Sequence, residues 1–158
     1  LGGGALLDLG IYPISYSSML FGCQPKKIAS SAQIGPTGVD HLASVVLDYG
    51  NDQMASMIFS LLTESPSQAI ISGSEGFIQI DGPFFGRTRA SLIIQKQVKA
   101  VCAPEYLGSG RAYQAIEVMD CMKKGKLQSD IMPLKDSLAI MKILDTLRQQ
   151  WNMTLPGD

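Results

Sequence analysis

The sequence is poor in the side chains that build metal sites and disulfide scaffolds. It has one histidine, His41, and three cysteines among 158 residues. Cys23, Cys102 and Cys121 are far apart and lie in apolar contexts, whereas a zinc site needs clustered cysteine or histidine ligands. We therefore expect no structural metal. The odd number of scattered cysteines indicates buried thiols in a reducing, cytoplasmic compartment.

The chain also lacks an excess of charge of one sign and a long apolar run. Its formal net charge is -1, and lysine and arginine are dispersed along it. It therefore offers no charged surface typical of binding to nucleic acids or anionic membranes. Uninterrupted apolar runs are only a few residues long, whereas a membrane-spanning helix needs about 20 residues. Nucleic acids and membranes are not expected as partners, and no signal peptide is expected.

The chain does contain enough apolar material for a packed core. Hydrophobic residues make up 46% of its 158 residues, so we predict a single globular domain over residues 1–158. The chain opens on Leu1, and its most chemically distinctive segment follows at once. This arrangement is expected if a preceding domain has been removed.

The distinctive segment is a glycine-rich helix start at residues 2–12, which carries Asp8 and Tyr12 four residues apart. At this spacing both side chains share one helical face and can reach the same small polar ligand. The flanking glycines would let backbone and ligand approach closely. The helix is predicted from about Leu6 to Phe21. Pro13 requires either that the regular helix begin near Tyr12 or that the preceding turn be irregular.

From Lys27 to about Cys102 the hydrophobic period changes from helical to two, as in β-strands. Two sets of residues alternate most clearly between the faces of one strand: Ala43, Val45, Leu47 and Tyr49 against Leu42, Ser44, Val46 and Asp48. A turn at 48–52 predicts a hairpin with residues 53–63, and further strands are predicted at 69–72, 77–80, 90–95 and 98–102. Because short turns separate them, the strands should form a largely antiparallel sheet of about six strands.

Helical periodicity returns after the strands. Apolar residues recur at helical spacing from Ala112 to Met122 and from Leu134 to Leu147. The fold class is therefore α+β, with helices packed on one face of the sheet.

The other face of the sheet is expected to be a dimer interface. Several strands are apolar on both sides, with Met57 and Phe59 on one side and Ile58 and Leu62 on the other. An open apolar sheet face needs a partner, and a second copy of the same chain is the simplest one.

Three segments carry a resemblance to one oxidoreductase family. They are the opening stretch at 2–12, the later Thr37-Gly38-Val39-Asp40 and the terminal Leu155-Pro156. The chain resembles, from end to end, the C-terminal domain of the Gfo/Idh/MocA family, which includes glucose-fructose oxidoreductase and inositol dehydrogenase. Within it the chain is most similar to dimeric dihydrodiol dehydrogenases and NADP-dependent xylose dehydrogenases. The resemblance implies a substrate-binding and dimerisation domain, preceded by a Rossmann domain that this chain does not contain.

The resemblance also implies a reaction. Family members transfer hydride between NAD(P), held mainly by the Rossmann domain, and a sugar or vicinal diol. Tyr12 matches the position that exchanges a proton with the substrate hydroxyl, where many members have His, and Asp8 matches an acid one turn earlier. Ser15 replaces an acid that many members carry. Tyr106 and Tyr113 would line the substrate pocket, and this chain alone should be inactive because it lacks the hydride carrier.

Plainer interpretations of the same residues stay open. Asp8 could cap the helix, Tyr12 could be a half-buried core aromatic, and Tyr113 could pack a helix on the sheet. His41 is left unassigned, since a lone histidine is more often structural. At the level of function, the alternative to an enzyme is a non-catalytic, nucleotide- and sugar-sensing regulator similar to the galactose-responsive repressor. Retention of both Asp8 and Tyr12 favours the enzyme.

Overall fold

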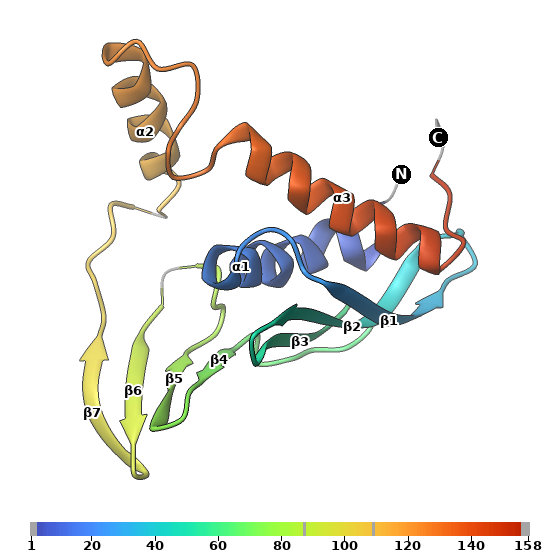
Figure 1. Ribbon diagram of the computed structural model, residues 1–158, viewed down its shortest axis with the longest axis horizontal. Coiled ribbons are helices and arrows are strands. Elements are labelled where there is room, and N and C mark those ends of the chain that lie inside the picture. Colours follow the sequence, from blue (N-terminus) through green and yellow to red (C-terminus); the bar gives the residue numbers. More distant parts are fainter. Residues whose placement is uncertain (1–2, 87, 109, 156–158) are drawn as a thin grey trace. The chain divides into compact units, whose positions relative to one another are not determined.

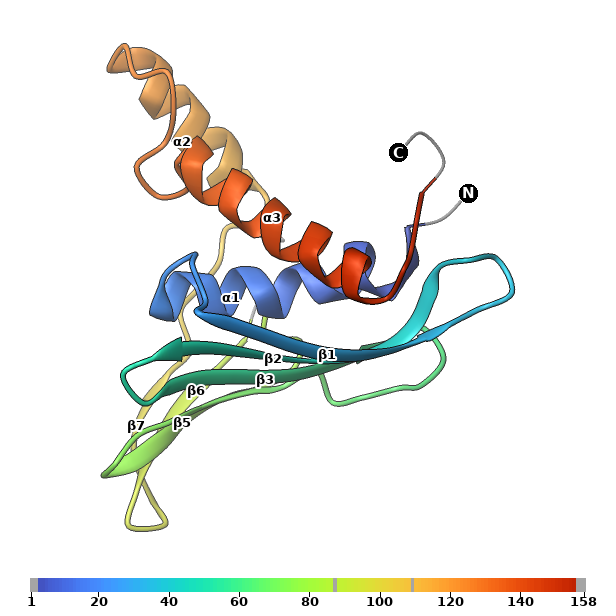
Figure 2. The ribbon, with the colours of Figure 1, turned by 45° about the vertical axis from the view of Figure 1, so that its right-hand side comes forward.

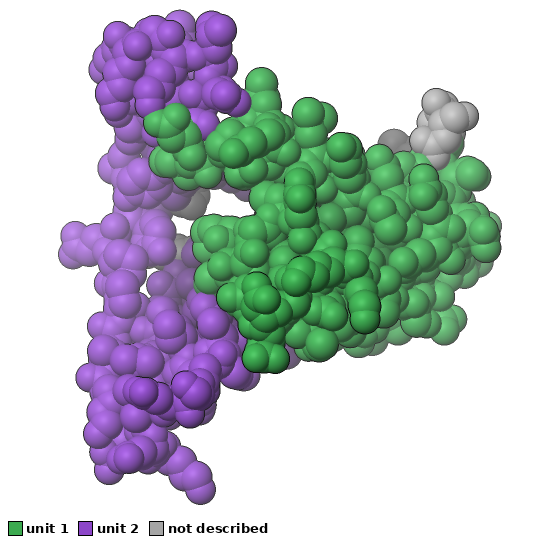
Figure 3. Space-filling model, viewed as in Figure 1, with its two compact units in different colours: residues 1–64, 130–158 green, residues 65–129 purple. Residues whose placement is uncertain are grey.

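The computed structural model describes residues 3–86, 88–108 and 110–155. Their contacts divide the chain into two compact units, which Figure 3 shows in green and purple. Unit 1 comprises Leu1–Glu64 and Asp130–Asp158, and unit 2 comprises Ser65–Ser129. Each unit is described by itself.

Unit 1 is a three-stranded antiparallel sheet covered on one face by helices (Figures 1 and 2). A π-helical turn η1 (Leu6–Gly10) runs directly into α1 (Ile11–Phe21). The strands β1 (Lys27–Ile34), β2 (Asp40–Gly50) and β3 (Gln53–Ser60) follow, and α3 (Leu134–Gln150) completes the unit. The strand order is β1-β2-β3.

The core of unit 1 lies between the helices and one face of β2. The inward residues of β2 are those that the alternation pattern placed together: Ala43, Val45, Leu47 and Tyr49, all buried. They pack with Phe59 of β3 and with apolar residues of all three helical elements: Leu6, Ile14, Ile140, Ile143, Leu144 and Leu147. The prediction for this strand is therefore confirmed, and so is the packing of the last helix on the sheet.

Two polar contacts attach the end of α3 to β1. The Gln150 side-chain amide donates to the Ile28 carbonyl oxygen at 3.0 Å, and the Trp151 indole N–H donates to the Ser30 hydroxyl oxygen at 2.8 Å. Such contacts join segments about 120 residues apart in sequence, so the N-terminal and C-terminal parts of the chain form one core.

The hairpin between β2 and β3 has the backbone that its sequence predicts. Asn51 and Asp52 have φ angles of 52° and 60°. Positive φ at both central residues is the requirement of a tight hairpin turn whose twist matches that of its strands, and Asn and Asp tolerate it. The predicted hairpin is therefore confirmed.

Pro13 explains why the first helix is irregular. Proline has no backbone N–H and is tolerated in the first turn of an α-helix. In the structure the α-helix begins at Ile11, so Pro13 lies in its first turn, and the preceding residues form a π-helical turn in which the Ile11 N–H reaches the Leu6 carbonyl oxygen. The regular helix therefore begins near Tyr12, and the turn before it is irregular, so the two alternatives predicted for this segment occur together.

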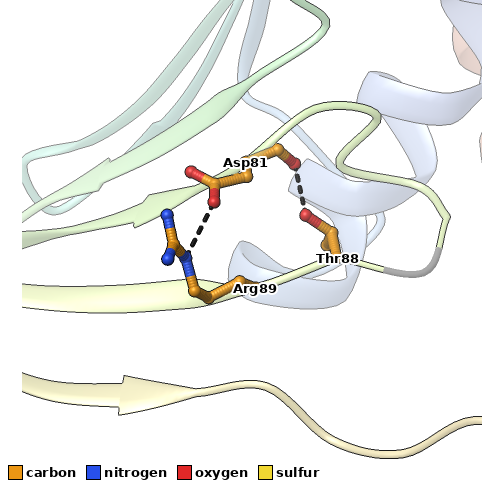
Figure 4. A network of polar contacts seen from close by, with 3 residues as sticks. All are labelled: Asp81, Thr88 and Arg89. Carbon is orange, nitrogen blue, oxygen red and sulfur yellow. Dashed lines mark hydrogen bonds and ion pairs between the residues drawn. The ribbon is translucent and has the colours of Figure 1, made fainter.

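Unit 2 is a four-stranded antiparallel sheet followed by one helix. Its elements are β4 (Ala69–Ser72), β5 (Gly76–Ile80), β6 (Ala90–Ile94), β7 (Gln97–Cys102) and α2 (Ala112–Lys123), with strand order β4-β5-β6-β7. The loop after β5 is closed by Asp81, whose carboxylate accepts from the Arg89 Nε–H at 3.0 Å and whose carbonyl accepts from Thr88 (Figure 4).

The antiparallel α+β architecture is confirmed, with the strands arranged differently from the single sheet expected. The described residues form seven strands in two sheets of three and four. Pro66 lies in the segment between β3 and β4, and proline cannot donate a ladder hydrogen bond. No side chain of α2 is buried in the described part of unit 2, so its apolar spacing does not correspond to packing on the sheet.

Gly10 sets how closely the first helix approaches the sheet. It is buried against the ring of Phe59, and a Cβ added to it would lie 2.7 Å from the ring Cζ atom. No real Cβ occupies that distance, so a glycine is required here for packing.

We predict that Gly10→Ala destabilises the protein by about 1–3 kcal/mol, the usual cost of overpacking a core. In an ordinary helix the same change would stabilise by roughly 0.5–1 kcal/mol. Urea denaturation measures the difference. In a Phe59→Leu background the cost of Gly10→Ala should shrink, because the opposing ring is gone. Strictly additive effects of the two substitutions would contradict this contact.

Candidate active site

An open cleft lies at the start of the first helix, entirely within unit 1. Its volume is about 550 Å³, within the range that holds small organic ligands. Eight residues from the helix start, the β1–β2 hairpin and the end of β3 line it: Gly3, Gly4, Leu7, Asp8, Thr37, Val39, His41 and Leu61. Asp8, predicted from sequence, is therefore part of a cleft, whereas Tyr12 is not among its lining residues.

Asp8 and Tyr12 are both accessible to solvent. Asp8 is exposed on the π-helical turn, and Tyr12, 42% exposed, is the second residue of α1. Neither side chain is sealed beneath the sheet. With 42% exposure Tyr12 is about half-buried, whereas Ile14 on the inner side of the same helix is fully covered, so the interpretation of Tyr12 as a half-buried aromatic stays open beside the catalytic one.

His41, which the sequence left unassigned, faces the same cleft as Asp8. Its imidazole lies against Gly35 in the β1–β2 hairpin, where an added Cβ would come within 2.0 Å of the ring. Its carbonyl oxygen accepts a hydrogen bond from the Leu61 N–H at 2.8 Å. The hairpin therefore holds the histidine in place. The only signal in the sequence was its position directly after Thr37-Gly38-Val39-Asp40.

Asp40, the neighbour of His41, is buried and contacts the helix start. Its side chain has 0% exposure, and its Oδ2 atom accepts a hydrogen bond from the Leu6 N–H at 2.7 Å. Burial raises the pKa of this carboxyl above its ordinary value, although the Leu6 hydrogen bond acts in the opposite direction. The carboxyl thus satisfies one of the N–H groups that a helix N-terminus leaves without a partner inside the helix.

Tyr106 and Tyr113 lie together in unit 2. Their ring centroids are 6.4 Å apart with the planes at 77°, an edge-to-face pair. The Tyr113 hydroxyl accepts a hydrogen bond from the Leu107 N–H at 3.1 Å. In the structure these rings organise the loop before α2, and Tyr113, 46% exposed, does not pack a helix on a sheet. A role in binding substrate stays a prediction.

No group of three or more His, Cys, Asp or Glu side chains that could hold a metal ion occurs among the described residues. In the same residues, no helix is both long enough and apolar enough to cross a membrane.

Comparison with known proteins identifies the family of this chain. Residues 1–79 match the family model described as GFO/IDH/MocA C-terminal domain. The chain belongs to this family, as the resemblance of its opening segment implied.

Its curated relatives include trans-1,2-dihydrobenzene-1,2-diol dehydrogenases. The enzyme of Xenopus tropicalis is 34% identical over 99% of this chain and 49% of its own length. The human enzyme is 33% identical over 99% of this chain and 48% of its own length. The chain therefore spans about half the length of the curated relatives it matches.

Solved structures share the fold at low identity. An aldose-aldose oxidoreductase from Caulobacter crescentus, complexed with glycerol, superposes with a TM-score of 0.79 at 17% identity, over 93% of this chain and 45% of its own. A 3-ketoreductase from Actinomadura kijaniata, in complex with TDP-benzene and NADP, superposes with a TM-score of 0.77 at 18% identity, over 94% and 47%.

The raised pKa of Asp40 predicts how stability depends on pH. The native carboxyl keeps its proton to higher pH than the unfolded chain, in which an Asp pKa is about 3.9. The free energy of unfolding therefore falls as the pH rises above that value, and it levels off above the raised pKa. Asp40→Asn stays neutral and removes this loss.

Urea denaturation of both proteins from pH ~4 upward tests the linkage. We expect the wild type to lose stability relative to Asp40→Asn as the pH rises, because every other titrating group is common to the two proteins. A difference that does not change with pH, or that changes in the opposite direction, would contradict the shift.

Proposed function

We propose that this chain is the substrate-binding part of an NAD(P)-dependent oxidoreductase that acts on a sugar or another vicinal diol. In this proposal Tyr12 exchanges a proton with the reacting hydroxyl, and Asp8 orients the substrate. The observation that carries the proposal is the exposed Asp8 carboxylate in a cleft at the helix start, four residues from the exposed Tyr12 phenol. These two groups occur in a chain one-third identical to dehydrogenases of a diol over almost all its length.

The composition of the cleft supports a hydroxylated ligand beside a nicotinamide ring. The Asp8 carboxylate can accept hydrogen bonds from substrate hydroxyls, and the Thr37 hydroxyl can donate or accept. Leu7, Val39 and Leu61 supply aliphatic surface for the face of a ring, and the two glycines leave space beside them. When bound, the nicotinamide accepts or returns the hydride.

The proposed role of Tyr12 follows from proton balance. When the substrate carbon gives up a hydride, its hydroxyl must also lose a proton as the carbonyl forms, and the phenolate oxygen of Tyr12 receives that proton. In the reverse direction the phenol returns it. A free phenol has a pKa near 10 and is a poor base at neutral pH, so a nearby positive charge must favour its ionised form.

The proposed role of Asp8 is to position the substrate, and it does not transfer the proton. Its carboxylate lies about one turn before Tyr12 on the helix surface, where it can hold a neighbouring hydroxyl of the substrate. A charge-assisted hydrogen bond of this kind fixes orientation more strongly than one between neutral groups. It would favour substrates that carry two adjacent hydroxyls.

We predict that Tyr12→Phe lowers turnover by roughly 10² to 10⁴, the usual contribution of general acid–base catalysis. The reaction should be followed by nicotinamide absorbance in the whole protein that contains this chain. Binding of the nicotinamide nucleotide should not change, because the substitution removes only a hydroxyl.

The matched control is Tyr16→Phe, which removes the same hydroxyl one turn further along α1. This variant should keep wild-type turnover. An unchanged rate in Tyr12→Phe, or equal losses in both variants, would remove Tyr12 from the mechanism.

We further propose that the uncovered face of the unit 1 sheet mediates homodimerisation. Ile58 on β3 is 69% exposed and Met54 is 61% exposed, while the inward neighbour Phe59 is buried. Apolar side chains gathered on an open sheet face favour association with another protein surface. A second copy of the same chain is the partner we propose.

Multi-angle light scattering at micromolar concentration should give the mass of a dimer for the whole protein, and Ile58→Lys should reduce it to a monomer by burying an unpaired charge. Gln149→Lys adds the same charge at an exposed position of α3 and should leave the dimer intact. A monomeric wild type would exclude this interface.

A further inference from the structure

Asp40 connects two parts of the chain that both contribute to the cleft. It is the first residue of β2, and its Oδ2 atom accepts the Leu6 N–H from a helix start 34 positions earlier in the sequence. Leu7 and Asp8, the next two residues after Leu6, line the cleft, and so does His41, the next residue after Asp40. Asp40 itself is buried and is not among the lining residues.

Gly4 shows how closely the two segments meet. Its φ is +75°, and a Cβ added to it would lie 2.1 Å from Asp40 Oδ1 and 3.0 Å from the Asp40 carbonyl oxygen. The backbone therefore crosses the carboxyl group at a distance that only glycine permits. The Asp40 carboxyl is therefore in contact with the helix start at Gly4 as well as at Leu6.

The contact between Asp40 and the helix start also carries a cost in stability. Asp40 Oδ1 is buried and has no hydrogen-bond partner within the described residues. A buried polar atom without a partner costs stability, and burying a carboxyl group adds to that cost. A neutral side chain could cap the helix with less penalty. Unfavourable local arrangements that persist are typical of functional sites.

We propose that Asp40 is a positioning residue. Through the Leu6 N–H it holds Asp8 in the cleft, and it keeps the helix start aligned with His41, which lines the same cleft. This inference rests on the function proposed above for Asp8. Asp40 touches neither substrate nor cofactor. It determines where the Asp8 carboxylate, which contacts the substrate, is placed.

Three substitutions in the whole protein separate position from charge. Asp40→Ala removes the acceptor, Asp40→Asn keeps an acceptor of the same length that cannot ionise, and Asp40→Glu keeps the carboxyl group but moves the acceptor by one methylene. The matched control is Asp48→Ala on the same strand, whose carboxylate accepts the Gly50 N–H at 2.8 Å in the β2–β3 hairpin, away from the cleft.

We expect Asp40→Ala and Asp40→Glu to lower turnover per folded molecule by about tenfold to a hundredfold, the effect of a displacement of about 1 Å at a reacting centre. Asp40→Asn should retain most of the turnover, and Asp48→Ala should retain all of it. The affinity for the nicotinamide nucleotide should be the same in all variants. If Asp40→Ala fails to fold, the comparison of turnover between Asp40→Asn and Asp40→Glu still tests the proposal.

A second readout does not need turnover. The ¹³C resonance of the Asp8 carboxyl should shift and the Leu6 amide should exchange faster in Asp40→Ala, and neither should change in Asp48→Ala. Unchanged signals in Asp40→Ala, or a Glu variant more active than the Asn variant, would overturn the proposal. If the wild type oxidises no sugar or diol, the proposed function fails, while the Asp8 and Leu6 signals still decide whether Asp40 positions Asp8.

Discussion

The hydrogen bond between the Leu6 N–H and the buried Asp40 carboxyl joins the start of the first helix to the start of the central strand of unit 1. Helix formation leaves the first N–H groups without partners inside the helix, so a helix that begins inside a core needs an acceptor from elsewhere. Asp40 supplies it from 34 residues away. The contact lies next to the cleft, because residues adjoining both of its ends line the cleft: Leu7 and Asp8 after Leu6, and His41 after Asp40.

The glycines of the opening segment serve the protein's own packing as well as the cleft. We expected them to give a ligand access to the backbone, and Gly3 and Gly4 do line the cleft. Gly10, however, is buried against Phe59, and Gly4 also accommodates Asp40. A glycine-rich motif therefore does not distinguish ligand approach from approach by another part of the same chain, because both require only the absence of a Cβ.

Local patterns predicted the elements well where one local cause dominates. The alternation over Ala43–Tyr49, the hairpin at Asn51 and Asp52, and the disturbance caused by Pro13 all appear in the structure. The division into two sheets was not predictable in the same way, since strand spacing does not say which neighbours pair. Apolar spacing also did not distinguish α3, which enters the core, from α2, none of whose described side chains is buried.

The sequence by itself determined the antiparallel α+β class, the family, and Asp8 and Tyr12 as candidate site residues, because these depend on periodicity and on residues near one another in the chain. Only the tertiary structure decided that Asp8 shares a cleft with His41 and that Asp40 holds the helix start. Both depend on contacts between residues more than thirty positions apart. Such contacts depend on how the helices pack on the sheet, and no local pattern records them.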